Sequence, residues 1–234
     1  MSVSKSNIVL FVLASLAAIA TFVMTAQADN DVSVAPLPGP TVEVSLSDER
    51  AEAYFAGGCF WCLEADFDKV TGVVETISGY TGGDVQNPNY KQVTYENTGH
   101  YEAVKVVYDP QTVTYSELVE YFWRHIDPTD GGGQFCDRGF SYLTGVFPAT
   151  ATELEIVERS KAAIEASNVL GNPIVTKIAT YKKFWPAEGY HQDYYLKNRL
   201  HYARYRRGCG RDARVADVWA GEKLQQAADN GHGS

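Results

Sequence analysis

The sequence has little positive charge, few cysteines and no second metal-binding pair. Lysine and arginine number 20 against 29 acidic residues, and the formal net charge of −9 argues against a nucleic-acid partner. The four cysteines include a single Cys-x-x-Cys pair, whereas a structural zinc site of this kind usually takes two pairs. These shortages disfavour nucleic-acid-binding and zinc-stabilised proteins, and we expect no bound metal.

The N-terminus differs in composition from the rest of the chain. Lys5 precedes an apolar run over residues 8–24, which is short for a membrane span. Ala26-Gln27-Ala28 then fits the small-residue pattern of signal-peptide cleavage. No cysteine stands at this point, so a lipoprotein is not indicated. We expect residues 1–28 to be a signal peptide of an exported protein, periplasmic or secreted, with an uncleaved anchor at residues 8–24 as the alternative.

One globular domain is expected to follow a short linker. Residues 29–49 are polar and contain Pro36, Pro38 and Pro40, which is typical of a flexible linker. Residues 50–219 carry the hydrophobic patterning, and a chain that is 45% hydrophobic can build a core of ordinary size. Residues 220–234 are weakly patterned and are predicted to be a disordered tail.

Hydrophobic periodicity predicts an α+β domain. The order β-α-β-β-α-β is that of a two-layer ferredoxin-like sheet with helices on one face. A further helix is expected over residues 150–168 and a strand over 174–180, and residues 182–218 are expected to form a long irregular C-terminal wrap of loops and short helices. The strands of the sheet are predicted at 53–56, 72–78, 101–108 and 142–147, with helices at 59–70 and 114–126. Thr114 with Glu117 and Thr150 with Glu153 have capping-box spacing at two of the predicted helix starts.

Two cysteines lie where a helix is predicted to begin. Cys59 and Cys62 follow a strand and the pair Gly57-Gly58. A helix N-terminus carries partial positive charge and favours a thiolate, so Cys59 is a candidate nucleophile. The alternative is a pair of buried cysteines that pack as small hydrophobic groups. Two structural disulfides are a further alternative, and four cysteines allow three pairings among which the sequence does not choose.

Glu102 is a candidate acid. On the predicted strand 101–108 it shares a face with Val104, Val106 and Tyr108. If that face meets the core, partial burial raises the pKa of the carboxyl and keeps a proton available near neutral pH. The alternative is a surface glutamate at a strand start. His100 could be a base but is more simply a loop histidine.

Five motifs resemble the A-type peptide methionine sulfoxide reductases, and they occur in the order found in that family. The resemblance runs from about residue 52 to about residue 219. The motifs are Gly58-Cys59-Phe60-Trp61-Cys62, Gly79-Tyr80-Thr81-Gly82-Gly83 with Asn87-Pro88-Asn89-Tyr90, Thr98-Gly99-His100-Tyr101-Glu102-Ala103-Val104, Gln134-Phe135-Cys136-Asp137-Arg138-Gly139, and Ala187-Glu188-Gly189-Tyr190-His191-Gln192-Asp193-Tyr194.

The resemblance implies an activity and a set of site residues. It implies reduction of the S epimer of methionine sulfoxide, protein-bound or free, through a sulfenic acid on Cys59 and an intramolecular disulfide. A thioredoxin-like dithiol would then restore the thiols, with no metal or organic cofactor, and we expect a monomer. The implied roles are nucleophile for Cys59, acid for Glu102, oxygen binding for Tyr90 and Tyr142, support for Asp137, and a methyl pocket from Phe60 and Trp61.

The thiol that resolves the sulfenic acid is left open by the sequence. Cys209, between two glycines near the C-terminus, is favoured because flexible C-terminal resolving cysteines occur in the family. Cys62 follows closely because it lies one helical turn from Cys59. Cys136 is ranked last, and a relay through two of these thiols is a further option.

Other functions compete with this reading. A thioredoxin-like oxidoreductase would use the Cys59 and Cys62 pair alone, and a binding module would use all four cysteines as structural disulfides. A basic run near the C-terminus could dock an acidic reductant, although a solvated or carboxylate-paired face is the commoner case. That run comprises Arg204, Arg206, Arg207, Arg211 and Arg214.

Overall fold

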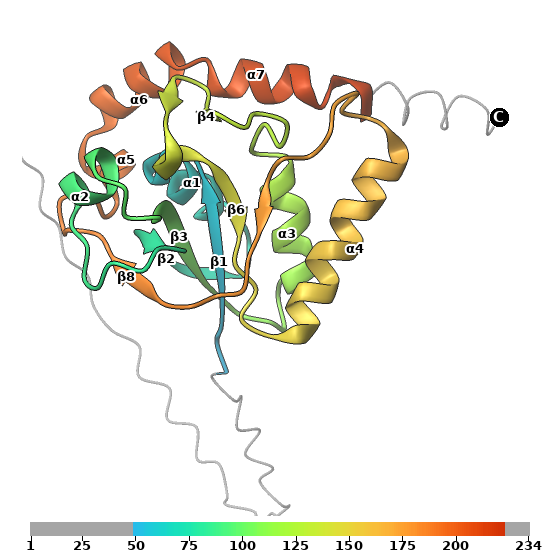
Figure 1. Cartoon of the computed structure of the whole chain (residues 1–234), viewed down its shortest axis with the longest axis horizontal. Coiled ribbons are helices and arrows are strands. Elements are labelled where there is room, and N and C mark those ends of the chain that lie inside the picture. The colour runs from blue at the N-terminus through green and yellow to red at the C-terminus, as the bar shows by residue number, and fades with distance from the viewer. Residues whose placement is uncertain (1–48, 223–234) are drawn as a thin grey trace, which may run out of the picture. The chain divides into compact units, whose positions relative to one another are not determined.

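The computed structural model describes residues 49–222, which form a mixed α+β domain around a central sheet (Figure 1). The predicted signal peptide, nearly all of the linker and most of the predicted tail lie outside the described residues. Across the described range, no helix is long and apolar enough to cross a membrane.

Strands and helices alternate along the chain. The strands are β1 (Ala51–Gly57), β2 (Val73–Thr81), β3 (Tyr101–Tyr108), β4 (Gly133–Gln134), β5 (Asp137–Arg138), β6 (Thr144–Val146), β7 (Lys177–Ile178) and β8 (Phe184–Pro186). The helices are α1 (Phe60–Phe67), α2 (Tyr90–Tyr95), α3 (Tyr115–Trp123), the 3-10 turn η1 (Phe140–Tyr142), α4 (Ala151–Ser167), α5 (Tyr194–Lys197), α6 (Arg199–Gly208) and α7 (Arg211–Val218).

The main sheet has the strand order β7-β6-β1-β3-β2-β8. Only β6 and β7 pair in parallel, and the other neighbours are antiparallel. Phe55 of β1 lies opposite Val104 of β3, and Tyr80 of β2 lies opposite Glu102 of β3. In this register the C-terminal ends of β1 and β2 lie next to the N-terminal end of β3, at the same end of the sheet.

The two faces of the sheet are covered differently. On β1, Ala53 and Phe55 point into the main core, where side chains from α1 and α3 meet the sheet. Tyr54 and Ala56 point to the opposite face, into a smaller cluster with Phe184. The alternation follows from the two-residue period of a strand, which places neighbouring side chains on opposite faces. Helix α4 packs outside α3 (Figure 1).

Local signals set the starts of two helices. Thr114 caps α3, accepting a hydrogen bond from the backbone N–H of Glu117, whose carboxylate accepts from the Thr114 N–H in return. Thr150 accepts from the backbone N–H of Glu153 at the start of α4. Both capping residues were predicted, since they satisfy N–H groups that the helix leaves unpaired.

Some expected elements are shorter or different. The predicted strand 174–180 is reduced to two residues, and the predicted helix 59–70 ends at Phe67. The short helix α2 was not predicted, although Asn89 and Gln92 form a capping box at its start. Tertiary contacts, which a local pattern does not report, decide where these elements stop.

The expectation of an irregular C-terminal wrap is wrong in part. Residues 182–218 include β8, which extends the sheet, and the helices α5, α6 and α7, which run along one side of the domain (Figure 1). Apolar residues recur only weakly at helical intervals in this segment, because α6 has no buried residue and α7 buries only Arg211. A helix held by charged and aromatic contacts lacks the aliphatic stripe on which sequence prediction depends.

Candidate active site

Cys59 lies between the end of β1 and the start of α1, as predicted. Gly58 has φ +82°, a left-handed conformation that glycine adopts readily. A Cβ atom on Gly58 would lie 2.6 Å from Cβ of Gln134, so packing requires glycine as well. The carbonyl oxygen of Cys59 accepts a hydrogen bond from the Cys62 N–H at 3.1 Å, which makes Cys59 the N-cap of α1.

Glu102 is buried beside this helix start. Its side chain is 2% exposed, and Oε2 accepts a hydrogen bond from the backbone N–H of Phe60 at 3.1 Å. Burial raises the pKa of Glu102 to about 8, although the hydrogen bond from Phe60 acts in the opposite direction. The carboxyl therefore retains its proton at neutral pH. The alternative of a surface glutamate, which the sequence left open, is therefore wrong, because this strand face is buried.

Two tyrosines adjoin the Glu102 carboxyl. Tyr142, at the end of η1, and Tyr90, the first residue of α2, lie near each other, and Tyr142 is close enough to Glu102 to lower the pKa of that carboxyl. Burial raises the pKa of both hydroxyls, so both stay protonated and can donate to an oxygen atom. The 3-10 turn and α2 thus deliver two hydroxyl groups to the buried acid.

Asp137 is linked to Cys59 through a residue that the sequence did not single out. The hydroxyl of Tyr205, on α6, donates a hydrogen bond to Asp137 and is close enough to the Cys59 thiol to lower its pKa. Asp137 is near enough to Glu102 to raise the pKa of that carboxyl. The five residues predicted as catalytic therefore lie together, and their individual roles stay predictions.

The two thiols of the Cys-x-x-Cys pair influence each other, and their pKa values are shifted in opposite directions. Burial raises the pKa of Cys59, and the neighbouring Cys62 and Glu102 raise it further. The Cys59 side chain lowers the pKa of Cys62, as do Arg211 and Arg206, while burial opposes them. The expectation that Cys59 is ionised at rest is wrong, because desolvation of a sulfur that is only 6% exposed outweighs the helix N-terminus.

The aromatic pair after Cys59 divides into a buried and a partly exposed ring. Phe60 is 1% exposed and packs against Tyr80 and His191. Trp61 is partly exposed, and its ring stacks on Tyr194 at 3.7 Å between centroids. Trp61 is therefore the ring of the pair that is open to solvent in part, Phe60 lies in the core, and the methyl pocket stays a prediction.

Glu188 and His191 were given no role from the sequence, although both stand in one of the motifs. Glu188 accepts hydrogen bonds from the Tyr80 hydroxyl and the Tyr90 N–H, each at 2.9 Å. Nδ1 of His191 accepts from Nε1 of Trp61 at 3.1 Å. Both residues therefore position side chains of the site. Both residues stand in a motif that the sequence analysis identified. Their hydrogen-bond partners are distant in the sequence, so no local pattern could reveal them.

His100 has a structural role, as the simpler reading expected. Its Nδ1 accepts a hydrogen bond from the Gly83 N–H at 3.2 Å, and its Nε2 lies 2.8 Å from the carbonyl oxygen of Val85. The buried ring therefore holds the loop after β2 and has both nitrogens engaged.

A disulfide joins Cys136 to Cys209, whereas Cys59 and Cys62 are free thiols. The sequence ranked Cys136 last, and the structure makes it the partner of Cys209. Cys136, Asp137 and Cys209 are also the single group among the described residues with metal-ligand spacing, but their two sulfurs are bonded to each other. The disulfide ties the end of α6 to the segment between β4 and β5.

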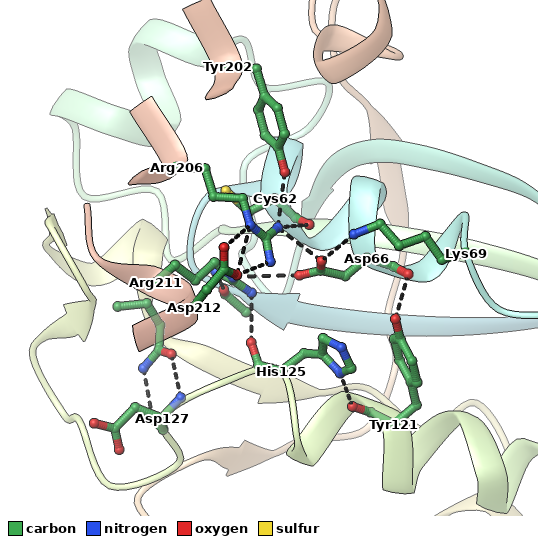
Figure 2. A network of polar contacts seen from close by, with 12 residues as sticks. Cys62, Asp66, Lys69, Tyr121, His125, Asp127, Tyr202, Arg206, Arg211 and Asp212 are labelled. Carbon is green, nitrogen blue, oxygen red and sulfur yellow. Dashed lines mark hydrogen bonds and ion pairs between the residues drawn. The ribbon is translucent and has the colours of Figure 1, made fainter. Parts of the chain in front are cut away.

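Three arginines of the basic run are paired with carboxylates. Arg206 and Arg211 reach the buried Asp66 at 2.9 and 3.6 Å (Figure 2). Arg214 reaches Asp127 at 2.7 Å. The carboxylate-paired reading of these three residues is confirmed. Arg206 and Arg211 contribute to the site because they surround the helix turn that carries Cys62.

The family model for peptide methionine sulfoxide reductase matches residues 51–223. The MsrA protein of Bacillus subtilis is 46% identical over 174 residues, which are 74% of this chain and 98% of that protein. The MsrA/MsrB protein of Vibrio cholerae is 46% identical over 184 residues, 79% of this chain, and the match spans about half of that longer relative (49%).

A solved structure agrees with the sequence comparisons. Methionine sulfoxide reductase A of Corynebacterium diphtheriae has a TM-score of 0.58 at 34% identity, covering 64% of this chain and 76% of that one. Sequence motifs, site geometry and fold all point to one family. The chain belongs to the peptide methionine sulfoxide reductases.

Proposed function

We propose that this protein reduces the S epimer of methionine sulfoxide to methionine. The observation that carries the proposal is the buried Glu102 carboxyl, protonated at neutral pH and hydrogen-bonded to the residue that follows Cys59. A sulfoxide oxygen leaves only when it is protonated, and a reducing sulfur must lie on the other side of the same S–O bond. Cys59, at the start of α1, supplies the reducing sulfur, and Glu102, at the start of β3, supplies the proton.

The steps follow from the positions of the groups. The Cys59 sulfur attacks the sulfoxide sulfur while Glu102 gives its proton to the oxygen, which Tyr90 and Tyr142 hold by hydrogen bonds. The hydroxyl then passes from the substrate sulfur to the Cys59 sulfur as the bond between the two sulfurs breaks, methionine departs with the electron pair, and Cys59 is left as a sulfenic acid. Trp61, backed by Phe60, borders the space for the methyl group on the substrate sulfur. None of these steps needs a metal or an organic cofactor.

The positions of the cysteines support Cys62 as the thiol that resolves the sulfenic acid. Cys62 is a free thiol one helical turn from Cys59, whereas Cys209, which the sequence favoured, is bonded to Cys136. Cys136 is exposed, while Cys59 and Cys62 are buried, so the Cys136–Cys209 bond is the more accessible to an external dithiol. A thioredoxin-like reductant would reduce that bond, and its thiols would then reduce the Cys59–Cys62 disulfide by exchange.

A stereochemical assay tests the proposal. The protein is offered both epimers of a methionine sulfoxide derivative with a thioredoxin system, and loss of each epimer is followed by chiral chromatography. Loss of the S epimer alone supports the proposal, and loss of neither rejects it. Insulin reduction, measured in parallel, would instead reveal a thioredoxin-like oxidoreductase.

Three finer features belong to the same proposal. The strand order β6-β1-β3-β2 within the larger sheet supports a ferredoxin-like topology for the β-α-β-β-α-β segment. The apolar run and the Ala26-Gln27-Ala28 sequence support export through a signal peptide, to the periplasm or the exterior. We also propose that the protein acts as a monomer on protein-bound or free methionine sulfoxide.

A further inference from the structure

One segment of the chain, residues 191–195, makes two contacts with the ring of Trp61. Nδ1 of His191 accepts the hydrogen bond of Trp61 Nε1 at 3.1 Å. The ring of Tyr194 stacks on Trp61, with an angle of 7° between the two planes. These contacts fix the plane of the ring that the proposed function places beside the substrate methyl group. Whatever holds residues 191–195 in place therefore also decides the shape of that pocket.

The same segment is bonded to α1 at Glu64, which lies one helical turn beyond Trp61. Oε1 of Glu64 accepts a hydrogen bond from the backbone N–H of Asp193 at 3.2 Å. Asp193 has φ +53°, a left-handed conformation that few residues other than glycine adopt, and the chain enters α5 from it. Asp193 stands between His191 and Tyr194 in the sequence. The Glu64 carboxyl thus binds the turn that joins the two side chains in contact with Trp61.

Glu64 is a buried acid with few partners. Its side chain is 0% exposed, and within the described residues its second oxygen, Oε2, has no hydrogen-bond partner. Ser78 of β2 is close enough to lower the pKa of Glu64, and its Oγ also lacks a partner among these residues. Burying a carboxyl costs free energy that an apolar side chain of the same size would not cost. The bond to the Asp193 N–H is the one contact that an apolar residue at position 64 would lose.

The ionisable groups that face Glu64 are acidic. They are Asp68, just after α1, and Asp193 and Tyr195, at the start of α5. Lys197 pairs with Asp193 at 3.1 Å, but both side chains are about half exposed, and water screens the charge of this lysine. Burial raises the pKa of Glu64 to about 7, the Asp193 N–H opposes this, and the carboxylates of Asp68 and Asp193 add to it. A proton on Glu64 therefore removes a repulsion against the same turn that its Oε1 holds.

We propose that Glu64 is a positioning residue for the substrate pocket: its neutral carboxyl holds the turn at Asp193 and, through this turn, keeps Trp61 in place. When Glu64 loses its proton, its carboxylate and that of Asp193 repel each other, the turn loosens, and Trp61 is held less firmly. The inference rests on the proposed function, because that function gives Trp61 its part in binding substrate. It adds a pH-dependent control of substrate affinity that is separate from the acid Glu102.

The first test observes Trp61 without any turnover. Full-length protein labelled with fluorotryptophan is titrated across neutral pH by fluorine NMR, and the Trp61 signal is identified by its loss in Trp61→Phe. We expect this signal to shift with a midpoint near pH 7 in the wild type. The shift should be absent in Glu64→Gln, whose amide oxygen still accepts from the Asp193 N–H but whose side chain never ionises. Glu155→Gln, exposed on α4, is the matched control and should keep the shift.

The second test measures the concentration of a methionine sulfoxide peptide that half-saturates methionine release in the first turnover. In the wild type this concentration should rise about fivefold from below to above neutral pH, which is the effect of losing one hydrogen bond. Glu64→Gln should keep the lower value throughout. Glu64→Leu, which cannot accept from the Asp193 N–H, should show the raised value at every pH. The maximal rate reports on the proton of Glu102 and should be little changed by either substitution.

A Trp61 signal that titrates equally in the wild type and in Glu64→Gln overturns the inference, because the shift would then come from another group, such as His191. A half-saturating concentration in Glu64→Leu equal to the lower wild-type value also overturns it. Circular dichroism shows whether Glu64→Leu is folded, and if it is not, the wild type and Glu64→Gln still decide. If the wild type releases no methionine, the proposed function fails, while the fluorine signal still reports on Glu64 and Trp61.

Discussion

The carboxylate of Glu102 accepts a hydrogen bond from the backbone N–H of Phe60 at 3.1 Å, across 42 positions of the chain. This contact joins the start of β3 to the first turn of α1. Because Phe60 follows Cys59 directly, the acid and the nucleophile are positioned by one backbone contact. A substrate that reaches Cys59 therefore meets Glu102 as well.

Glu102→Gln is expected to abolish proton donation while keeping the fold. The amide oxygen can still accept from the Phe60 N–H, and a neutral amide is easily accommodated where the carboxyl is already neutral. We expect methionine release in the first turnover to fall by about 10² to 10⁴-fold, which is the usual contribution of a general acid. Rapid-quench assays measure it, with the exposed Glu75→Gln as control. A rate within a factor of a few of the wild type would rule out Glu102 as the acid.

The first turnover is expected to depend on pH through Glu102. Burial raises the pKa of this group to about 8, so the protonated fraction falls above that value and the rate of methionine release should fall with it. The descending limb should disappear in Glu102→Gln. If the rate of methionine release in Glu102→Gln still fell at the same pH, the fall would be due to another ionisable group.

The free energy of unfolding should depend on pH, because burial raises the pKa values of two glutamates in the folded state. Glu102 and Glu64 have pKa values near 8 and 7 in the folded state, above the value of 4.5 for an exposed glutamate. Between these limits the folded state binds more protons than the unfolded state, so the free energy of unfolding should decrease as pH rises from about 4.5 to about 8. Urea unfolding across this range measures the slope, which should be flatter in Glu102→Gln. If the free energy of unfolding decreased with pH more steeply in Glu102→Gln than in the wild type, the raised pKa of Glu102 would be contradicted.

Gly58→Ala is expected to lower the free energy of unfolding by more than a Gly→Ala substitution at an open position with positive φ. Gly58 has φ +82°, and the added Cβ would lie 2.6 Å from Cβ of Gln134. A left-handed conformation costs a non-glycine residue about 1 to 2 kcal/mol, and the clash adds to this. Gly171→Ala is the control, since it has φ +66° and would meet no described atom within 4 Å. Equal losses of unfolding free energy in the two variants would show that the contact with Gln134 does not matter.

Cys209→Ser is expected to separate the first turnover from recycling. The variant should release methionine at the wild-type rate once, because Cys59 and Cys62 remain. Repeated turnover with a thioredoxin system should slow about 10-fold or more, since the exposed disulfide that exchanges with the reductant is lost. Steady-state consumption of NADPH measures this. Full multiple-turnover activity in Cys209→Ser would show that the buried pair is reduced directly.

Local sequence was sufficient for the elements that hold the acid and the nucleophile. Apolar residues over 101–108 predicted strand β3, and Gly57-Gly58 preceded the predicted start of α1. The capping residues Thr114 and Thr150 predicted two helix starts. Each of these depends on neighbours within a few positions, and backbone sterics or unpaired N–H groups act at that range.

Tertiary structure decided the pairing of the cysteines and the acidity of the thiols. Cys136 and Cys209 are 73 positions apart, and no local pattern distinguishes their pairing from the two others that four cysteines allow. The sequence predicted an ionised Cys59 from the helix N-terminus alone. Burial of that sulfur raises the pKa of Cys59, and Arg206 and Arg211 from the C-terminal helices act to lower the pKa of Cys62. Desolvation and long-range charge depend on what surrounds a group in space, so they arise only once the chain has folded.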